Sequence, residues 1–237
     1  PLAVSFYNWD DQCCPMLEYS CFYSCKMGDD DIFKESAFWS NPLISSVLFC
    51  GTAQGPIVAY QILTEENELS DVVPVCLLFG HKTRVVSITK TSSQLYSNCI
   101  GSLSVDGTLS LISVDDFTIY KNVNKLFSEN SISLSSVDMN SRLMIAAQCY
   151  GVFEVADVEA GIILFKVSGF SSLIRNVVSY NQLFCVSCVD GTNSIFHIIE
   201  DSAKCLFSFN VCDKSDCSFI DSKLSPGLQY ALILKHD

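Results

Sequence analysis

A turn glycine between two apolar stretches recurs through most of this 237-residue chain. In the clearest copy, "SVDGTLSLISV", the dipeptide Asp106-Gly107 separates two runs of alternating apolar and polar residues, a pattern typical of a β-hairpin. Glycine suits this position because a positive φ costs it little. The turn glycines of the four copies lie at intervals of 52, 44 and 40 residues: Gly55, Gly107, Gly151 and Gly191. A near-fixed period indicates that one structural unit is repeated, and that unit decides the architecture.

Each repeat contains four predicted strands. One apolar strand precedes the glycine and a second follows it. A third returns after an acidic loop, and a fourth precedes the pair, as "TRVVSITK" precedes the hairpin at Gly107. Four strands in a period of about 40–45 residues predict a blade of a β-propeller. A β-sandwich is the alternative, and it explains the short strands but not the recurring four-part order.

The composition restricts the classes of partner. Hydrophobic residues make up 49% of the chain and charged residues 17%, so a sizeable core is expected. A net charge of −12 with only 14 scattered Lys and Arg residues argues against nucleic acid and favours a protein partner with basic patches. No apolar run is long enough for a membrane-spanning helix, so we expect no direct membrane insertion. The cysteines, 13 at irregular spacing, indicate reduced thiols and a cytoplasmic protein.

One repeat resembles a WD repeat. Its segments "LLFGHKTRVVSITK" and "SLSVDGTLSLISV" are similar to the Gly-His and Trp-Asp signatures of that family. The resemblance implies a buried hydrogen-bonded tetrad of His81, Ser104 and Asp106, with Ile112 in the place of the tryptophan. Such a chain stabilises a blade because each polar group satisfies the next in a low dielectric. The other repeats diverge at the Trp-Asp position, which holds Tyr60-Gln61, Ala156-Asp157 and Phe196-His197.

The expected fold is therefore an all-β WD-repeat β-propeller with about five divergent four-stranded blades, part of a ring that closes with seven. Residues 40–237 are expected to hold the blades. The last blade is expected to be truncated, because "LQYALILKHD" resembles a copy cut at its turn. Residues 1–39 are expected to form an N-terminal segment in which "PLAVSFYNW" is an edge strand that closes the ring.

The order of the repeats is similar to that of the N-terminal propeller of the rabconnectin beta subunit family. The similar features are "ISSVL", a long first connection, "LLFGH" and the third repeat, "CYGVFEVADVEAGIILFKV", over roughly residues 40–199. The resemblance implies a non-catalytic scaffold that assembles or regulates the vacuolar proton-pumping ATPase. The implied partners are the rabconnectin alpha subunit and cytosolic subunits of the pump, with peripheral recruitment to acidifying organelles or vesicles. The alternative is a WD-repeat adaptor of a ubiquitin ligase or of a membrane-traffic coat complex.

Motifs for catalysis are missing from the sequence, so we expect no enzyme activity, no cofactor and no metal. There is no nucleophile elbow, phosphate loop or dinucleotide fingerprint. With His81 assigned to the tetrad, few bases remain for nucleophilic catalysis. The run Asp29-Asp30-Asp31 is read as solvated charge in a turn. Two groups of cysteines lack the Cys-x2-Cys pairs of a structural zinc site: Cys13, Cys14, Cys21 and Cys25, and Cys205, Cys212 and Cys217.

Overall fold

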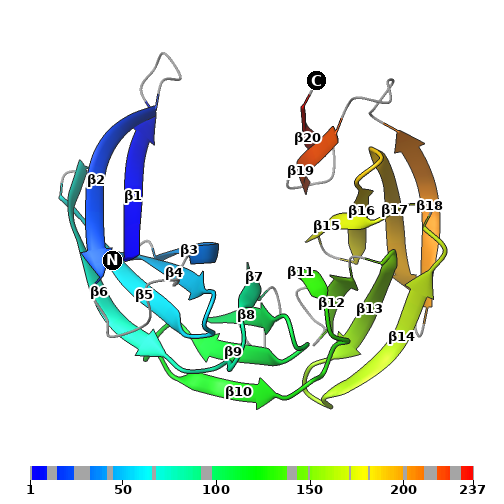
Figure 1. The fold of residues 1–237 in the computed structure, drawn as a ribbon, viewed down its shortest axis with the longest axis horizontal. Helices are drawn as coiled ribbons and strands as arrows, with labels where there is room; N and C mark the ends of the chain where they lie inside the picture. Colours follow the sequence, from blue (N-terminus) through cyan, green and yellow to red (C-terminus); the bar gives the residue numbers. More distant parts are fainter. Residues whose placement is uncertain are drawn as a thin grey trace.

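The computed structural model describes residues 2–9, 15–23, 33–41, 45–65, 68–91, 98–137, 143–148, 150–170, 172–180, 182–199, 202–210, 218–224 and 231–236. These residues form strands and turns, with no helix among them. The strands stand in successive sheets around an open arc (Figure 1).

Four antiparallel four-stranded sheets, blades 1 to 4, follow one another along the chain. Blade 1 consists of β3 (Phe33–Asn41), β4 (Ser45–Thr52), β5 (Ile57–Glu65) and β6 (Glu68–Leu78). Blade 2 consists of β7 (Val85–Lys90), β8 (Cys99–Ser104), β9 (Leu109–Ser113) and β10 (Ile119–Val123). Blade 3 consists of β11 (Ser131–Val137), β12 (Leu143–Gln148), β13 (Val152–Asp157) and β14 (Ile162–Ser168). Blade 4 consists of β15 (Ile174–Tyr180), β16 (Leu183–Cys188), β17 (Thr192–Ile199) and β18 (Ser202–Asn210).

Within each blade the spatial order of the strands is their order in the chain. The first strand of each blade lies toward the middle of the arc and the fourth lies at its outer margin (Figure 1). The first strands β3, β7, β11 and β15 contact one another from blade to blade. Consecutive four-stranded meanders placed side by side in this way are blades of a β-propeller. The predicted all-β propeller fold is confirmed.

Two two-stranded sheets flank the four blades. β1 (Leu2–Trp9) pairs with β2 (Pro15–Tyr23), and β19 (Ser218–Leu224) pairs with β20 (Ala231–His236). β2 contacts β6, and β19 contacts β15, so the two pairs stand at opposite ends of the arc (Figure 1). Blade 1 begins at Phe33, before the expected boundary at residue 40, and the fifth copy contributes two described strands. Closure of a seven-bladed ring, and a closing role for residues 1–39, stay predictions.

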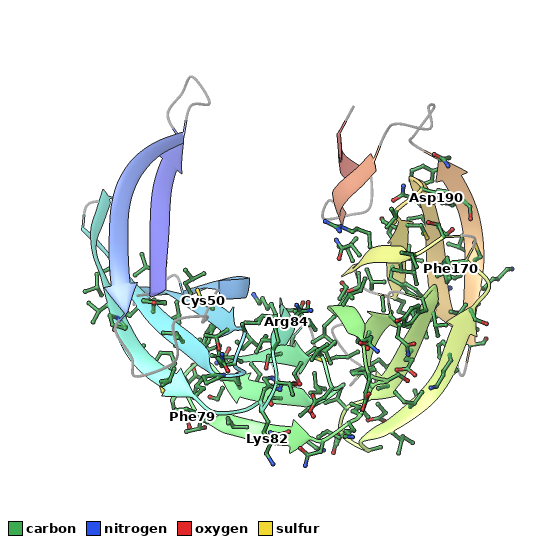
Figure 2. All side chains as sticks on the ribbon, in the orientation of Figure 1. Cys50, Phe79, Lys82, Arg84, Phe170 and Asp190 are labelled. Atoms are coloured by element: carbon green, nitrogen blue, oxygen red, sulfur yellow. The ribbon has the colours of Figure 1, made fainter. Side chains whose placement is uncertain are left out.

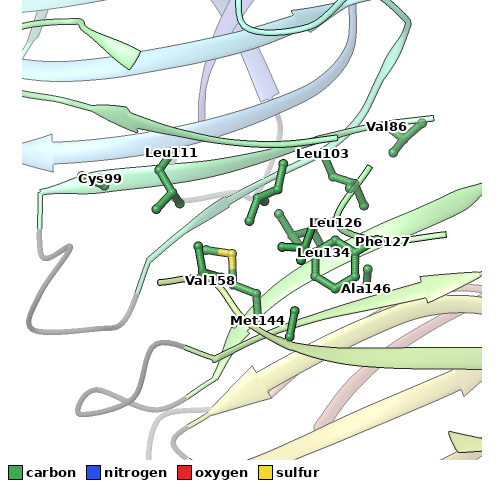
Figure 3. Packing of buried hydrophobic residues seen from close by; sticks show 12 residues of the cluster. Val86, Cys99, Leu103, Leu111, Leu126, Phe127, Leu134, Met144, Ala146 and Val158 are labelled. Carbon is green, nitrogen blue, oxygen red and sulfur yellow. The ribbon is translucent and has the colours of Figure 1, made fainter. Parts of the chain in front are cut away.

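The hydrophobic core lies between neighbouring blades. Between blades 2 and 3, Leu103 and Leu111 face Met144 and Ala146 (Figure 3). Between blades 3 and 4, Phe153 contacts the rings of Phe184 and Phe196, and the three ring centroids lie 5.1–5.3 Å apart. The middle strands, such as β8, are buried on both faces because each is covered from both sides. The fourth strand β10 instead alternates between half-buried and exposed residues, since its outer face meets solvent.

Hydroxyl groups join the first strands of adjacent blades. Ser87 on β7 accepts the amide of Leu134 on β11 at 3.1 Å. Ser133 on β11 donates to Asn176 Oδ1 at 2.9 Å and accepts the amide of Val177 at 3.2 Å. The Ser-rich sequence of the first strands therefore supplies polar contacts between blades where the backbone ladders stop.

Candidate interaction surface

One face of the arc carries the turns between second and third strands together with the connections from each blade to the next. Successive strands are antiparallel, so the second strand, the fourth strand and the start of the following blade meet at the same edge. We call this face the loop face. Its described segments are 53–56, 79–84, 105–108, 124–130, 150–151, 169–170, 172–173 and 189–191. The sequence-predicted tetrad and all four turn glycines belong to it or to the strands beneath it.

His81 lies in the connection from β6 to β7 and is buried. Its Nε2 lies 2.7 Å from the hydroxyl of Ser102 on β8. Ser102 in turn donates to the carbonyl of Ser110 at 3.4 Å, which makes the neutral imidazole the donor at Nε2. The neighbouring Gly80 carbonyl accepts the Ser110 hydroxyl at 3.2 Å and the Asn122 amide at 2.7 Å. The Gly80-His81 connection is thus held by side chains from the second, third and fourth strands of blade 2.

Ser104 and Asp106 form a separate contact at the end of β8. The Ser104 hydroxyl donates to Asp106 Oδ1 at 2.5 Å, and the Thr108 amide donates to the same oxygen at 3.2 Å. Burial alone would raise the pKa of Asp106, but these hydrogen bonds outweigh it and hold the pKa below its usual value. The structure therefore brings Ser104 and Asp106 together and joins His81 to Ser102, which the sequence did not single out. Ile112 is fully buried in the apolar core between blades 1 and 2.

The other blades replace this arrangement with different buried polar groups. In blade 3, Glu154 on β13 accepts the amide and the hydroxyl of Ser128 at 2.7 and 2.6 Å and pairs with Lys166 on β14. In blade 4, Ser187 donates to Asn193 Oδ1 at 2.6 Å, and Asn193 donates to the Gly191 carbonyl at 2.8 Å. Each set fastens a loop-face segment to the strands below it. The loop face therefore stands on a rigid base.

Burial sets the protonation of His81. It lowers the pKa of the imidazole to about 4, although the nearby Asp106 carboxylate favours the charged form. Among the described residues, His81 Nδ1 has no hydrogen-bond partner. A proton added at Nδ1 would therefore be buried without a directly bonded acceptor. Folding therefore keeps the His81 imidazole neutral down to a pH of about 4, whereas in the unfolded chain it takes up a proton near pH 6.5.

We expect acid to destabilise the protein through His81. Between pH 6.5 and about 4 the unfolded state binds more protons than the folded state. As the pH is lowered through this window, the contribution of His81 to the free energy of unfolding decreases by about 3 kcal/mol, and above pH 6.5 that contribution is constant. His81→Ala is expected to cost about 2 kcal/mol at pH 7.5, because Ser102 loses its partner, and to flatten the slope between pH 6.5 and 4. Urea unfolding at a series of pH values measures both effects. The control is His197→Ala, since the His197 side chain is half-buried and its hydrogen bond to Gln182 is exposed. Identical pH slopes for the His81→Ala and parent proteins would refute this account.

The described side chains offer no metal-binding cluster. No group of three or more His, Cys, Asp and Glu residues in the described ranges could hold a metal ion. Burial raises the pKa of the thiols of Cys185 and Cys188 to about 11, so both stay protonated and poorly nucleophilic. Cys205 is exposed on β18 and free. The side chains of Cys13, Cys14, Cys21, Cys25, Cys212, Cys217 and Asp29-Asp30-Asp31 lie outside the described residues.

In the described ranges, no helix has the length and hydropathy that a membrane-spanning segment requires. No family model matches the sequence, and no curated protein matches it. In structure the chain is similar to one in the crystal structure of the mitotic checkpoint complex, with a TM-score of 0.62 at 13% identity. The match covers 84% of this chain and 57% of that one, so this chain spans little more than half of that chain's length. In total 1361 solved chains match, so the likeness establishes a widespread fold, that of the β-propeller, and does not choose among its functions.

Proposed function

We propose that the chain is a non-catalytic WD-repeat scaffold that assembles or regulates the vacuolar proton-pumping ATPase, in a complex of the rabconnectin type. The observation that carries the proposal is the sequence resemblance over residues 40–199, above all "LLFGH" and the third repeat. In the structure, "LLFGH" is the end of β6 and the connection that places His81 on Ser102. The third repeat is blade 3, whose loop connection is held by Glu154.

The architecture suits a subunit that holds others in register. A propeller is a rigid body whose loops present a wide surface, and here each loop-face segment is tied to strands by buried polar groups. The proposed partners are the rabconnectin alpha subunit and cytosolic subunits of the pump. The proposed location is the cytoplasm, with recruitment to the surface of acidifying organelles through these protein contacts. The likeness to a chain within a protein complex supports protein partners in general.

Affinity purification of the full-length tagged protein, followed by mass spectrometry, tests this proposal. We expect the rabconnectin alpha subunit and cytosolic pump subunits to be enriched over a purification from untagged cells. Because the chain carries a net charge of −12, recovery should decrease when the wash is raised from about 0.1 M to 1 M salt, where the screening length falls from about 10 to 3 Å. Recovery of a ubiquitin ligase or coat complex, with neither pump nor rabconnectin subunits, would replace the proposal with the adaptor alternative.

A further inference from the structure

Backbone hydrogen bonds hold the inner margin of the loop face. The residue after a blade's second strand donates its amide to the residue before that blade's first strand: Val105 to Arg84 in blade 2 and Val189 to Leu173 in blade 4, each at 2.9 Å. Asn130, which precedes β11 of blade 3, donates to the Val105 carbonyl at 2.9 Å. We call these five residues the inner loop edge. These hydrogen bonds fix the backbone of the inner loop edge. Its residues therefore occupy corresponding positions in the blades, although their side chains differ.

The corresponding position before the first strand changes its chemistry from blade to blade. It holds Arg84 in blade 2, Asn130 in blade 3 and Leu173 in blade 4, and all three side chains are exposed. Figure 2 shows Arg84 close to the inner strands, with Lys82 of the same connection farther out. The inner loop edge is therefore basic at one end and apolar at the other.

The apolar end is larger than a single exposed residue. Leu173 is 51% exposed and its backbone partner Val189 is 39% exposed. The turn at Tyr150-Gly151 adjoins the same connection, since a Cβ on Gly151 would lie 3.2 Å from the Ser172 carbonyl oxygen. Tyr150 itself is 72% exposed. Exposed aromatic and aliphatic side chains that gather on loops held by a rigid base mark a protein-binding surface.

Lys125 on the loop face pairs with Glu129, but three other cations on or beside this face have no such partner. Within the part of the chain that the structure describes, Lys82, Arg84 and Arg175 have no ion-pair partner. Arg175 flanks the apolar end, because it and Leu173 are both exposed on either side of the buried Ile174.

The described segments of the loop face carry as many cations (Lys82, Arg84 and Lys125) as anions, whereas the described turns of the opposite face carry carboxylates without cations. On the loop face Asp106 accepts Ser104, Glu129 pairs with Lys125, and Asp190 accepts the amide of Thr192. The opposite face instead presents exposed carboxylates on its turns: Asp115, Asp116 and Glu159. The loop face is therefore the part of this acidic protein best suited to an acidic ligand.

We propose that the inner loop edge binds an extended segment of a partner protein, with Asp or Glu residues over Arg84 and apolar side chains over Leu173 and Val189. This inference deepens the proposed scaffold function and rests on it. The apolar side chains supply most of the affinity because Leu173, Val189 and Tyr150 lose water on contact. The carboxylates set the direction of the segment and speed its encounter. The net charge of the chain alone would favour a basic partner, so the acidic preference belongs to this face.

Selection of random peptides of about 15 residues, roughly 50 Å when extended, on the immobilised full-length protein identifies the preferred sequence. We expect enriched peptides to carry an acidic cluster separated from a pair of aromatic or aliphatic residues. The most enriched peptide, labelled with fluorescein, then serves as the probe in anisotropy titrations. Leu173→Asp should weaken its binding at least tenfold. Arg84→Glu should weaken it several-fold and reduce the dependence of Kd on salt.

Two matched variants control for general effects of added charge. Ile162→Asp places the same charge at a residue that is 53% exposed, at the start of β14 on the opposite face. Lys204→Glu reverses an exposed cation on β18. Both should leave binding unchanged. Thermal unfolding of every variant tests whether the fold persists. If it does not, Leu173→Ala and Arg84→Gln provide milder changes.

The proposal fails if no peptide is enriched, if the enriched peptides are basic, or if Leu173→Asp and Ile162→Asp bind the probe equally well. This failure is distinguishable from failure of the proposed function. Pump subunits recovered equally by the parent and the Leu173→Asp protein would keep the scaffold and discard the peptide site. An acidic–apolar peptide that binds the inner loop edge of a protein recovered without pump subunits would do the reverse.

Discussion

Gly107→Ala is expected to lower the free energy of unfolding by about 4 kcal/mol, a large part of the roughly 5–15 kcal/mol that stabilises an ordinary domain. Gly107 has a φ of +80°, a region that residues with a Cβ avoid. A Cβ there would lie 1.8 Å from the carbonyl oxygen of Phe127 and 2.7 Å from its carbonyl carbon. These are backbone atoms of the connection from blade 2 to blade 3, and the Phe127 amide donates to the Gly107 carbonyl at 3.0 Å. Relief of the clash must therefore move the connection and break this bond.

Gly169→Ala separates the two causes of this loss. Gly169 also has a positive φ, +103°, but nothing lies within 4 Å of the position of its Cβ. Its substitution should therefore cost only the backbone strain, about 1–2 kcal/mol. Urea unfolding monitored by circular dichroism measures both variants. Equal losses for Gly107→Ala and Gly169→Ala would show that the contact with Phe127 is not rigid and that φ alone matters.

The turn glycines show which features of the fold the sequence repeat predicts. Gly55, Gly107, Gly151 and Gly191 all have positive φ values, between +76° and +111°, and each lies between the second and third strands of a blade. The period predicted the blades because every blade places two middle strands between neighbouring sheets, which cover them on both faces. The same pattern of residues is therefore needed in each repeat. The sequence also predicted that Gly80 and His81 precede the first strand of blade 2. The turn glycine and the Gly80-His81 connection are local features, so each can be predicted from the sequence of a single repeat.

The partner of His81 could not be predicted from spacing. Ser102 and Ser104 are two residues apart on β8 and point to the same face, so both fit the pattern equally well. The path of the connection from β6 decides between them, and that path depends on Ser110 and Asn122 holding the Gly80 carbonyl. The chemistry of the inner loop edge was hidden for the same reason. Arg84 and Leu173 correspond only once the backbone bonds of Val105 and Val189 are known.

Glu154 was missed because a lone carboxylate in a strand is usually read as a solvent-facing residue. Here it is fully buried, and its partners come from the connection before blade 3 and from the adjacent strand. Burial alone would raise the pKa of Glu154, but the hydrogen bonds and charge of Lys166 and the bonds from Ser128 lower it below the usual value. The carboxylate is therefore ionised and fully bonded in the folded protein.

Removal of this carboxylate should cause the second large loss of stability. We expect Glu154→Ala to lower the free energy of unfolding by about 4 kcal/mol, because it leaves the partly buried Ser128 amide without its acceptor and opens a cavity. Glu154→Gln keeps the volume but turns an amide group toward donors, and should cost about 2 kcal/mol. Urea unfolding at pH 7.5 measures both. The control is Glu129→Gln, which breaks only the exposed pair with Lys125, 3.5 Å apart, and should cost less than about 0.5 kcal/mol.

The pH dependence distinguishes the charge of Glu154 from its shape. A carboxyl group whose pKa is lowered by folding stabilises the protein above its unfolded pKa of about 4.5, and this stabilisation is lost as the pH falls through the folded value. The parent protein should therefore lose stability more steeply below pH 4.5 than Glu154→Gln, which has no proton to bind. This window overlaps the one assigned to His81 only between pH 4.5 and about 4, so the His81→Ala and Glu154→Gln proteins resolve the two groups in a single series of urea titrations. Parallel acid curves for the parent and Glu154→Gln would mean that the carboxylate is not held ionised by Ser128 and Lys166. The link from blade 3 to its connection would then rest on packing alone.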